Sequence, residues 1–149
     1  MPPSKTVRIR VCGILVENGR LLLISHKKDG GIYWLLPGGG VNYGESLDQA
    51  LVREFMEELN IGIAIGPLAM VCDSIDPEGE RHVLNICFRC TYDSGEFRIG
   101  SEERLHGYSF FDAESLGELP MYPPLNGPLV SILNNSNKEI YLGRIWQDK

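Results

Sequence analysis

A glycine-rich loop that leads directly into an acidic helix is the feature that most constrains this chain. Residues 37–40 read Pro-Gly-Gly-Gly, a run that we do not expect to form regular secondary structure. A helix is predicted over 46–59, because Ser46 is a good N-cap and Gln49 three residues later completes a capping box. Asn60 favours the left-handed conformation in which many helices end. The apolar residues of this helix recur at helical spacing: Leu47, Ala50, Leu51, Phe55 and Leu59.

Three glutamates occupy positions that a purely structural helix would avoid. At about 100° per residue, Glu54 and Glu58 lie roughly 40° apart, and Glu57 lies about 60° from Glu54 on the other side. Glu54 and Glu58 also fall within the apolar sector, where a carboxylate loses hydration. One interpretation is a solvated charged face, although like charges at this spacing repel. The other is that the three carboxylates converge on a hard cation such as Mg²⁺, beside a loop that brings backbone groups close to a phosphate.

The remaining sequence predicts an α+β protein in which strands dominate. An Asn18-Gly19 hairpin turn is expected between the first two strands. Strands are predicted over residues 6–16, 21–25, 61–75 (one or two strands), 81–92, 107–111 and 140–146. A short helical turn is predicted over 116–119 and a second helix over 125–133. Because no repeat or linker divides the chain, we expect a single domain over 1–149, with a mixed sheet covered by helices.

Composition narrows the functional classes. A net charge of −6 and a pI near 5.0 argue against binding to a nucleic-acid polymer or a membrane, which usually requires a basic patch. The apolar runs are far too short to span a bilayer, and the N-terminus lacks a signal-peptide pattern, so a cytoplasmic protein is expected. An acidic protein that binds an anionic phosphate needs a positive charge between the two, and a divalent cation would supply it.

The cysteines are predicted to be reduced and buried, with no metal-binding or redox role. Cys87 and Cys90 form a C-x-x-C motif, but residues three apart on a strand point to opposite faces and so cannot easily share a ligand. Cys12 and Cys72 form no second pair with the spacing of a zinc site. We therefore interpret all four as small buried hydrophobes.

The stretch from Gly39 to Ile61 resembles the Nudix box, the signature of the Nudix (MutT-like) hydrolases. The pattern is G-x5-E-x7-R-E-U-x-E-E-x-G-U, where U is aliphatic, and it is matched by Gly39, Glu45, Arg53, Glu54, Glu57, Glu58 and Ile61. The preceding residues 36–39, Leu-Pro-Gly-Gly, are similar to the family's usual lead-in. Phe55 replaces a smaller aliphatic residue, and Asn60 replaces a glycine whose left-handed turn asparagine also adopts. The resemblance implies the Nudix fold, an α/β/α sandwich around a mixed sheet, over about residues 6–146.

The resemblance implies a metal site on the acidic helix. Glu57 and Glu58 are the implied principal ligands of Mg²⁺, with Mn²⁺ as an alternative metal. Glu54 is implied to be a further ligand or the general base. The backbone carbonyl of Gly38 or Gly39 would complete the metal shell. The implied reaction is attack of water on a phosphorus of a diphosphate bridge, with the metal offsetting the phosphate charge.

The resemblance also implies supporting residues around the metal site. Arg53 is counted with the catalytic residues because an arginine orients carboxylates through bidentate bonds. Glu45, Gly38 and Asn60 are implied to support the box structurally. Many family members draw a further catalytic glutamate from a loop beyond the box. We place Glu103 in this role and leave the general base open among Glu54, Glu102 and Glu103, although two adjacent loop acids are also typical of a solvated loop.

The substrate is less constrained than the chemistry. ADP-ribose or another nucleotide sugar is the first hypothesis, because Pro77 follows the box as a proline does in some ADP-ribose pyrophosphatases, although a turn at 76–79 also explains it. A normal or oxidised nucleoside triphosphate is the second hypothesis, and a non-catalytic ligand sensor is the third. Four aromatic residues are candidates to stack on a base or to lie in the core: Tyr33, Trp34, Phe88 and Tyr108. The family also forms homodimers, for which the N-terminal strand or residues 140–146 would supply a sheet edge.

Overall fold

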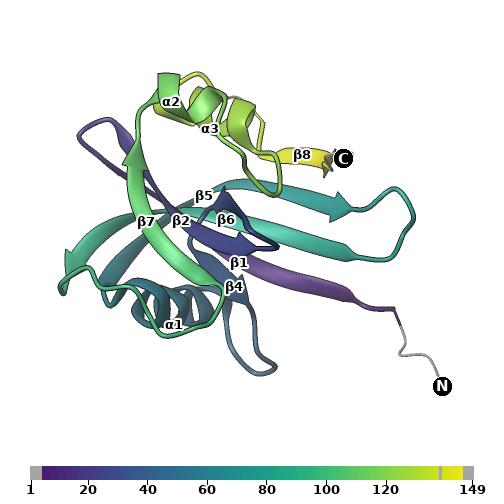
Figure 1. The fold of residues 1–149 in the computed structure, drawn as a ribbon, viewed down its shortest axis with the longest axis horizontal. Coiled ribbons are helices and arrows are strands. Elements are labelled where there is room, and N and C mark those ends of the chain that lie inside the picture. The colour runs from purple at the N-terminus through teal and green to yellow at the C-terminus, as the bar shows by residue number, and fades with distance from the viewer. Residues whose placement is uncertain (1–4, 138, 146–149) are drawn as a thin grey trace.

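The computed structural model describes residues 5–137 and 139–145, which form a mixed β-sheet with helices on both faces (Figure 1). The strands are β1 (Val7–Glu17), β2 (Arg20–Lys28), β3 (Gly31–Leu35), β4 (Gly38–Gly40), β5 (Gly62–Ile75), β6 (His82–Ser94), β7 (Leu105–Phe111) and β8 (Tyr141–Ile145). The helices are α1 (Leu47–Leu59), α2 (Ala113–Gly117) and α3 (Asn126–Leu133). The predicted α+β class is therefore confirmed.

The strands are hydrogen-bonded in the order β3-β2-β1-β6-β5-β8, while β4 pairs with β1 and β7 pairs with β2. The pairs β1/β6 and β5/β8 are parallel and the others are antiparallel. The N-terminal strand β1 is interior, because β6 covers one side and β2 and β4 share the other. The expectation that β1 offers a free edge for dimerisation is therefore wrong. β8 does lie at an end of this order, and the predicted strand residue Trp146 lies outside the described residues.

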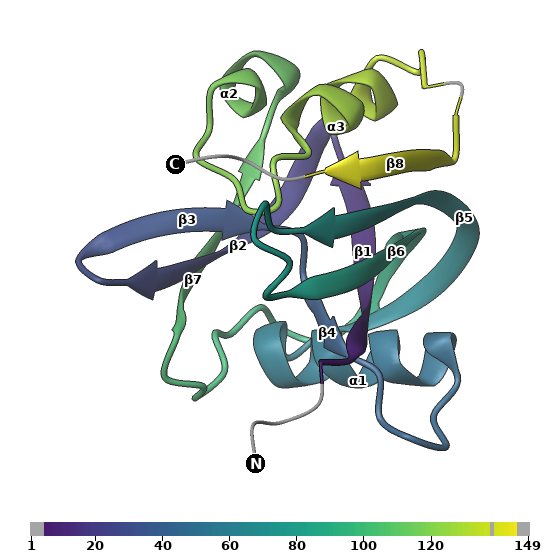
Figure 2. The same ribbon diagram turned by 90° about the vertical axis from the view of Figure 1, so that its right-hand side faces the viewer.

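The sheet separates two hydrophobic cores, as expected for an α/β/α sandwich. Helix α1 covers one face, and α2 and α3 cover the other, as Figures 1 and 2 both show. Side chains of β1 alternate between the two cores, since Val11 and Leu15 pack toward α1 and Cys12 and Ile14 pack toward the other helices. In the core between α1 and the sheet, the helix contributes the apolar residues that were predicted from their helical spacing.

The caps of α1 form as predicted. The Ser46 side chain accepts a hydrogen bond from the Gln49 backbone N–H, and the Gln49 side chain accepts one from the Ser46 N–H at 2.9 Å. Asn60 ends the helix with φ 60° and ψ 30°, in the left-handed conformation. Capping at both ends fixes the helix axis, and with it the direction of the glutamates.

The glycine run is a strand and not an irregular loop, so that prediction is wrong. β4 pairs antiparallel with β1 at residues 10–12. The chains approach so closely that a Cβ atom on Gly38 would lie 2.0 Å from the carbonyl oxygen of Val11. A Cβ atom on Gly39 would lie 2.4 Å from Cδ of Glu54. Glycine serves here to let the backbone approach its neighbours, and this use does not break the extended conformation.

Other boundaries differ in ways that have local causes. The short helix α2 begins at Ala113, earlier than the predicted 116–119, because the Asp112 side chain accepts a hydrogen bond from the Ser115 N–H at 2.8 Å and caps it. The one or two strands predicted over 61–75 are a single strand, β5, with a register shift between Ile65 and Leu68 at the Gly-Pro pair. No helix in the described part of the chain is long and apolar enough to span a membrane.

The four cysteines are free and buried, as predicted. Cys87 belongs to the core under α2 and α3, whereas Cys90 belongs to the core under α1. The C-x-x-C motif therefore directs its two thiols to opposite faces of the sheet, and it does not form a shared binding site.

Candidate active site

Glu58 is a buried carboxylate at the inner side of α1. Glu58 is only 4% exposed, and its Oε1 accepts a hydrogen bond from the Gly38 N–H at 2.9 Å. Burial raises the pKa of Glu58 to about 8, although the charge of Arg10 and the Gly38 hydrogen bond act in the opposite direction. The predicted position in the apolar sector is thus confirmed, and β4 binds this carboxylate directly.

Glu54 lies one turn earlier, against the same strand. Its carboxylate packs on the α-carbon of Gly39, which leaves no room for a side chain there. Burial raises the pKa of Glu54, although the Arg53 guanidinium donates to Oε1 at 2.8 Å and acts against this shift. Gly38 and Gly39 therefore place the two inner carboxylates side by side along β4.

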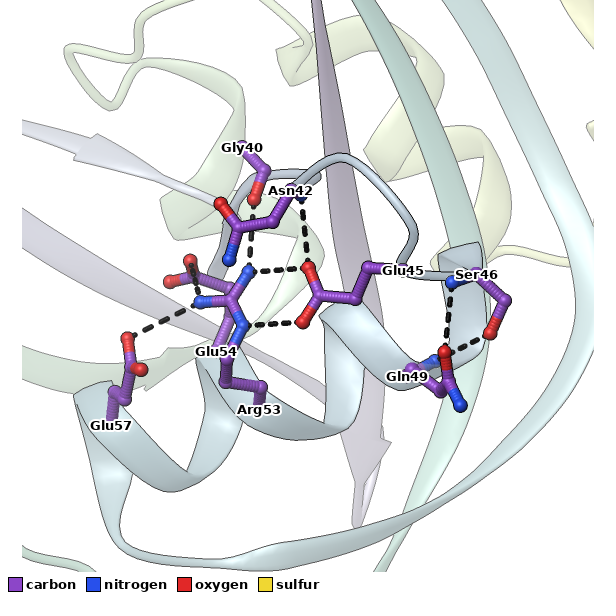
Figure 3. Close-up of polar contacts among 8 residues, drawn as sticks. All are labelled: Gly40, Asn42, Glu45, Ser46, Gln49, Arg53, Glu54 and Glu57. Atoms are coloured by element: carbon purple, nitrogen blue, oxygen red, sulfur yellow. Dashed lines mark hydrogen bonds and ion pairs between the residues drawn. The ribbon is translucent and has the colours of Figure 1, made fainter.

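Arg53 organises the outer side of the site (Figure 3). Its Nε and Nη2 donate to the two carboxylate oxygens of Glu45 at 2.7 and 2.9 Å, which is a bidentate arrangement. Nη2 also donates to the Gly40 carbonyl oxygen at 3.0 Å, and Nη1 contacts Glu54 and, at 3.4 Å, Oε2 of Glu57. The Arg53 hydrogen bonds lower the pKa of Glu45 to about 2, so Glu45 is an anion at neutral pH. The Arg53 guanidinium thus binds groups on the loop before α1, on β4 and on two turns of α1.

A model of the NUDIX domain matches residues 5–131. The chain belongs to the Nudix family. It is 33% identical over 113 residues to an ADP-ribose pyrophosphatase of Methanocaldococcus jannaschii, which covers 74% of this chain and 65% of that protein. It is 38% identical over 111 residues to the NAD-capped RNA hydrolase NudC of Photorhabdus laumondii, which covers 74% of this chain and 40% of that protein. The chain therefore spans less than two thirds of the length of these curated relatives.

A solved structure supports the fold assignment. The MutT NUDIX hydrolase from Burkholderia pseudomallei is similar to this chain with a TM-score of 0.74 at 26% identity, covering 85% of this chain and 98% of that one. The Nudix fold inferred from the sequence is confirmed.

The donor atoms of the Nudix box suit a hard divalent cation. Glu54, Glu57 and Glu58 offer carboxylate oxygens, and Gly38 and Gly39 offer backbone carbonyls next to them. As the side chains stand, the described residues contain no group of three or more acidic, histidine or cysteine side chains placed to hold a metal ion. Glu57 is 60% exposed and bound only weakly by Arg53, so its side chain is free to turn toward the inner pair. A cation there would also offset the charge of the buried carboxylate, which fits the donor set.

Arg10 is a site residue that the sequence interpretation missed. It lies on β1 opposite Gly40 of β4, and its Nη2 donates to the Leu36 carbonyl oxygen at 2.9 Å. Nη1 lies 2.7 Å from Sγ of Cys12. Its positive charge acts on Glu58, where it lowers the carboxyl pKa. The sequence does show an arginine among the alternating apolar residues of a predicted core strand. Which groups Arg10 contacts, however, depends on the pairing of β1 with β4.

The loop after β6 reaches the Nudix helix and then β2. Backbone hydrogen bonds join the Gly100 N–H to the Glu58 carbonyl oxygen at 3.0 Å and the Lys27 N–H to the Arg104 carbonyl oxygen at 2.9 Å. Glu102 and Glu103 are both exposed in the turn between these anchors. The charge of Glu102 acts on Glu58 and on the ring of His26, so Glu102 is the loop acid whose charge reaches the buried carboxylate.

The four aromatic candidates differ in their packing and exposure. Trp34 packs against Phe111 with ring centroids 4.8 Å apart, and Phe88 packs against the core under α1. Tyr108 is 37% exposed and stacks on Phe97 at 5.1 Å. Tyr33 is half-buried beside His26, near the loop that carries Glu102. Trp34 and Phe88 are half-buried as well, so Tyr108 is the only one of the four that is exposed.

Proposed function

We propose that this Nudix protein hydrolyses a pyrophosphate bond in a nucleoside diphosphate that is linked to a second moiety. The observation that carries the proposal is the pair of inner carboxylates at the glycine strand β4, where Arg53 holds Glu54 and also contacts Glu57, and the Gly38 N–H holds the buried Glu58. A helix that needed only stability would not bury Glu58 with a raised pKa. ADP-ribose or another nucleotide sugar is the proposed substrate class, and the similarity to an ADP-ribose pyrophosphatase supports this choice.

We propose Mg²⁺ as the cofactor, because all candidate donors are oxygens and Mg²⁺ is commonly shared between carboxylates and substrate phosphates. Glu57 and Glu58 would be its principal ligands, with Glu54 as a third ligand or the base. The bound ion supplies positive charge that offsets the diphosphate. Arg53 orients Glu54 and Glu57, and Glu45 holds Arg53 in place. A loop acid, Glu102 or Glu103, is the other candidate to accept the proton of the attacking water.

We further propose a cytoplasmic, small-molecule enzyme. Four free thiols suit a reducing compartment. The net charge of −6 disfavours a polymeric nucleic-acid partner or a membrane surface. A homodimer paired through the edge strand β8 remains part of the proposal, and light scattering tests it, since a monomeric mass would remove it.

The test of this function is product formation from a substrate panel with Mg²⁺. The panel contains ADP-ribose, other nucleotide sugars, NAD, NAD-capped RNA, dinucleoside polyphosphates, coenzyme A, and normal and oxidised triphosphates. We expect strong turnover of the nucleotide-sugar class, and loss of that turnover when EDTA is added. Turnover of triphosphates alone would overturn the substrate assignment. Binding without turnover in a folded, metal-supplied preparation would favour the sensor hypothesis.

A further inference from the structure

We propose that His26 is a positioning residue, whose Nε2–H holds the carboxylate of Glu102 in place as the general base. The inference rests on the proposed function, because it assigns a task within the same reaction. It selects Glu102 over the neighbouring Glu103 and gives a reason for a histidine near the end of β2.

The His26 ring is fixed by its neighbours on the face that α1 covers. His26 pairs with Tyr33 across the β2/β3 ladder, and Nδ1 lies 3.2 Å from the Tyr33 hydroxyl. The two rings meet edge to face at 5.5 Å, and Tyr33 in turn meets Tyr122 edge to face at 6.1 Å. If the hydroxyl donates to Nδ1, the ring proton must reside on Nε2. The ring then presents one donor in a fixed direction.

That donor is buried without a hydrogen-bond partner among residues 5–137 and 139–145. Buried polar atoms in native proteins are nearly always paired, so an unpaired one calls for an acceptor that arrives in a functional state. A carboxylate is the acceptor that gains most, because a charge-assisted hydrogen bond is stronger than a neutral one.

Glu102 is the acid that the backbone brings to this donor. The β2/β7 register shifts between Ser25 and His26, so that His26 lies opposite Leu105. The Leu105 N–H donates to the Glu102 carbonyl oxygen at 3.1 Å, and the Lys27 N–H donates to the Arg104 carbonyl oxygen in the same turn. Glu102 itself is exposed and free to change rotamer.

The electrostatics agree with this placement. Burial lowers the pKa of His26, and Glu102 acts in the opposite direction. The positive charges of Arg10 and Arg104 also lower its pKa. His26 is thus a neutral donor at neutral pH, and Glu102 is the carboxylate whose charge reaches both this ring and Glu58.

A double-mutant cycle on the full chain tests the pairing. We expect His26→Ala to lower kcat by about tenfold to a hundredfold, with little change in KM, as for the loss of a residue that orients another. In a Glu102→Gln background, His26→Ala should cause no further loss. His26→Gln should recover part of the activity, because its amide offers a donor near the Nε2 position. Glu114→Gln on α2 is the control for removing an exposed acid.

Two kinetic results would overturn the inference. One is a loss from His26→Ala that persists in full in the Glu102→Gln background. The other is a rise in KM at constant kcat, which would make His26 a substrate contact. A readout independent of turnover is the titration of the His26 ring by NMR. Glu102→Gln should move it to lower pH and Glu103→Gln should leave it in place, and an unchanged titration in Glu102→Gln would contradict the pairing. Absence of turnover in the wild-type protein would instead remove the proposed function, while the NMR titration would still decide the pairing.

Discussion

At the scale of single residues, Glu58 is the carboxylate of the site whose ionisation is most strongly opposed by burial. Its carboxylate is buried beside Glu54, and the charge of Arg10 and one backbone N–H compensate for this burial in part. The wheel position of Glu58 and Glu54 in the apolar sector was predictable from the sequence. Arg10 and His26 were not, because their targets depend on which strands pair, and no local pattern in the sequence specifies that pairing.

The burial of Glu58 predicts an inverted pH dependence of stability for the metal-free protein. The pKa of Glu58 is about 8 in the folded state, above the value of about 4.3 expected for an unfolded chain. Between these values the folded state binds more protons, so the free energy of unfolding should fall as pH rises through this window. Glu58→Gln removes the buried charge and should raise the free energy of unfolding by on the order of 5 kcal/mol near pH 8.

Urea unfolding in EDTA, from about pH 5 to pH 8, measures this dependence. Glu114→Gln is the matched control, because that carboxylate is exposed on α2. A wild-type stability that stays constant over this range, with no gain in Glu58→Gln, would contradict the assigned burial of the charge.

At the scale of elements, the site is a contact between α1 and the glycine strand β4. Helix α1 was predictable to its caps, because Ser46, Gln49 and Asn60 carry local signals. β4 was not, because a glycine run has no side-chain pattern and its strand character comes from pairing with β1. The early start of α2 depended on one cap, Asp112, which the apolar pattern alone did not reveal.

The close approach of α1 and β4 predicts that two neighbouring glycines differ in their tolerance to alanine. Gly39→Ala should displace the Glu54 carboxylate, because its Cβ would lie 2.4 Å from Cδ of that side chain. We expect kcat to fall by about a hundredfold, as for a misplacement of about 1 Å in a reacting group. Gly40→Ala is the control, because its Cβ would only approach Arg8 at 3.9 Å. Steady-state kinetics on both variants should separate them, and equal losses would show that the Glu54 contact is unimportant.

At the scale of the whole molecule, the sandwich places the site where one helix, one loop and the centre of the sheet meet (Figure 2). The mixed sheet covered by helices was predictable from the alternation of strands and two helices, and the placement of helices on both faces was implied by the Nudix resemblance. The interior position of β1 was not predictable, because parallel pairing with β6 joins residues 75 positions apart, as in Val11 and Ile86. Substrate choice also depends on the whole molecule, because the segments expected to recognise the substrate, the loop beyond β6 and the β2/β3 hairpin, lie outside the box.

The most direct test of the central claim is turnover of ADP-ribose, with Mg²⁺, by the wild-type protein, Glu57→Gln and the control Glu114→Gln. Glu57 is exposed on α1 and its side chain is bound by Arg53 at 3.4 Å, so glutamine should leave the fold intact. The account predicts turnover by the wild type and the control, and loss of at least about a thousandfold in Glu57→Gln. Turnover by a folded Glu57→Gln at the wild-type rate would contradict the assignment of the box carboxylates as the metal site.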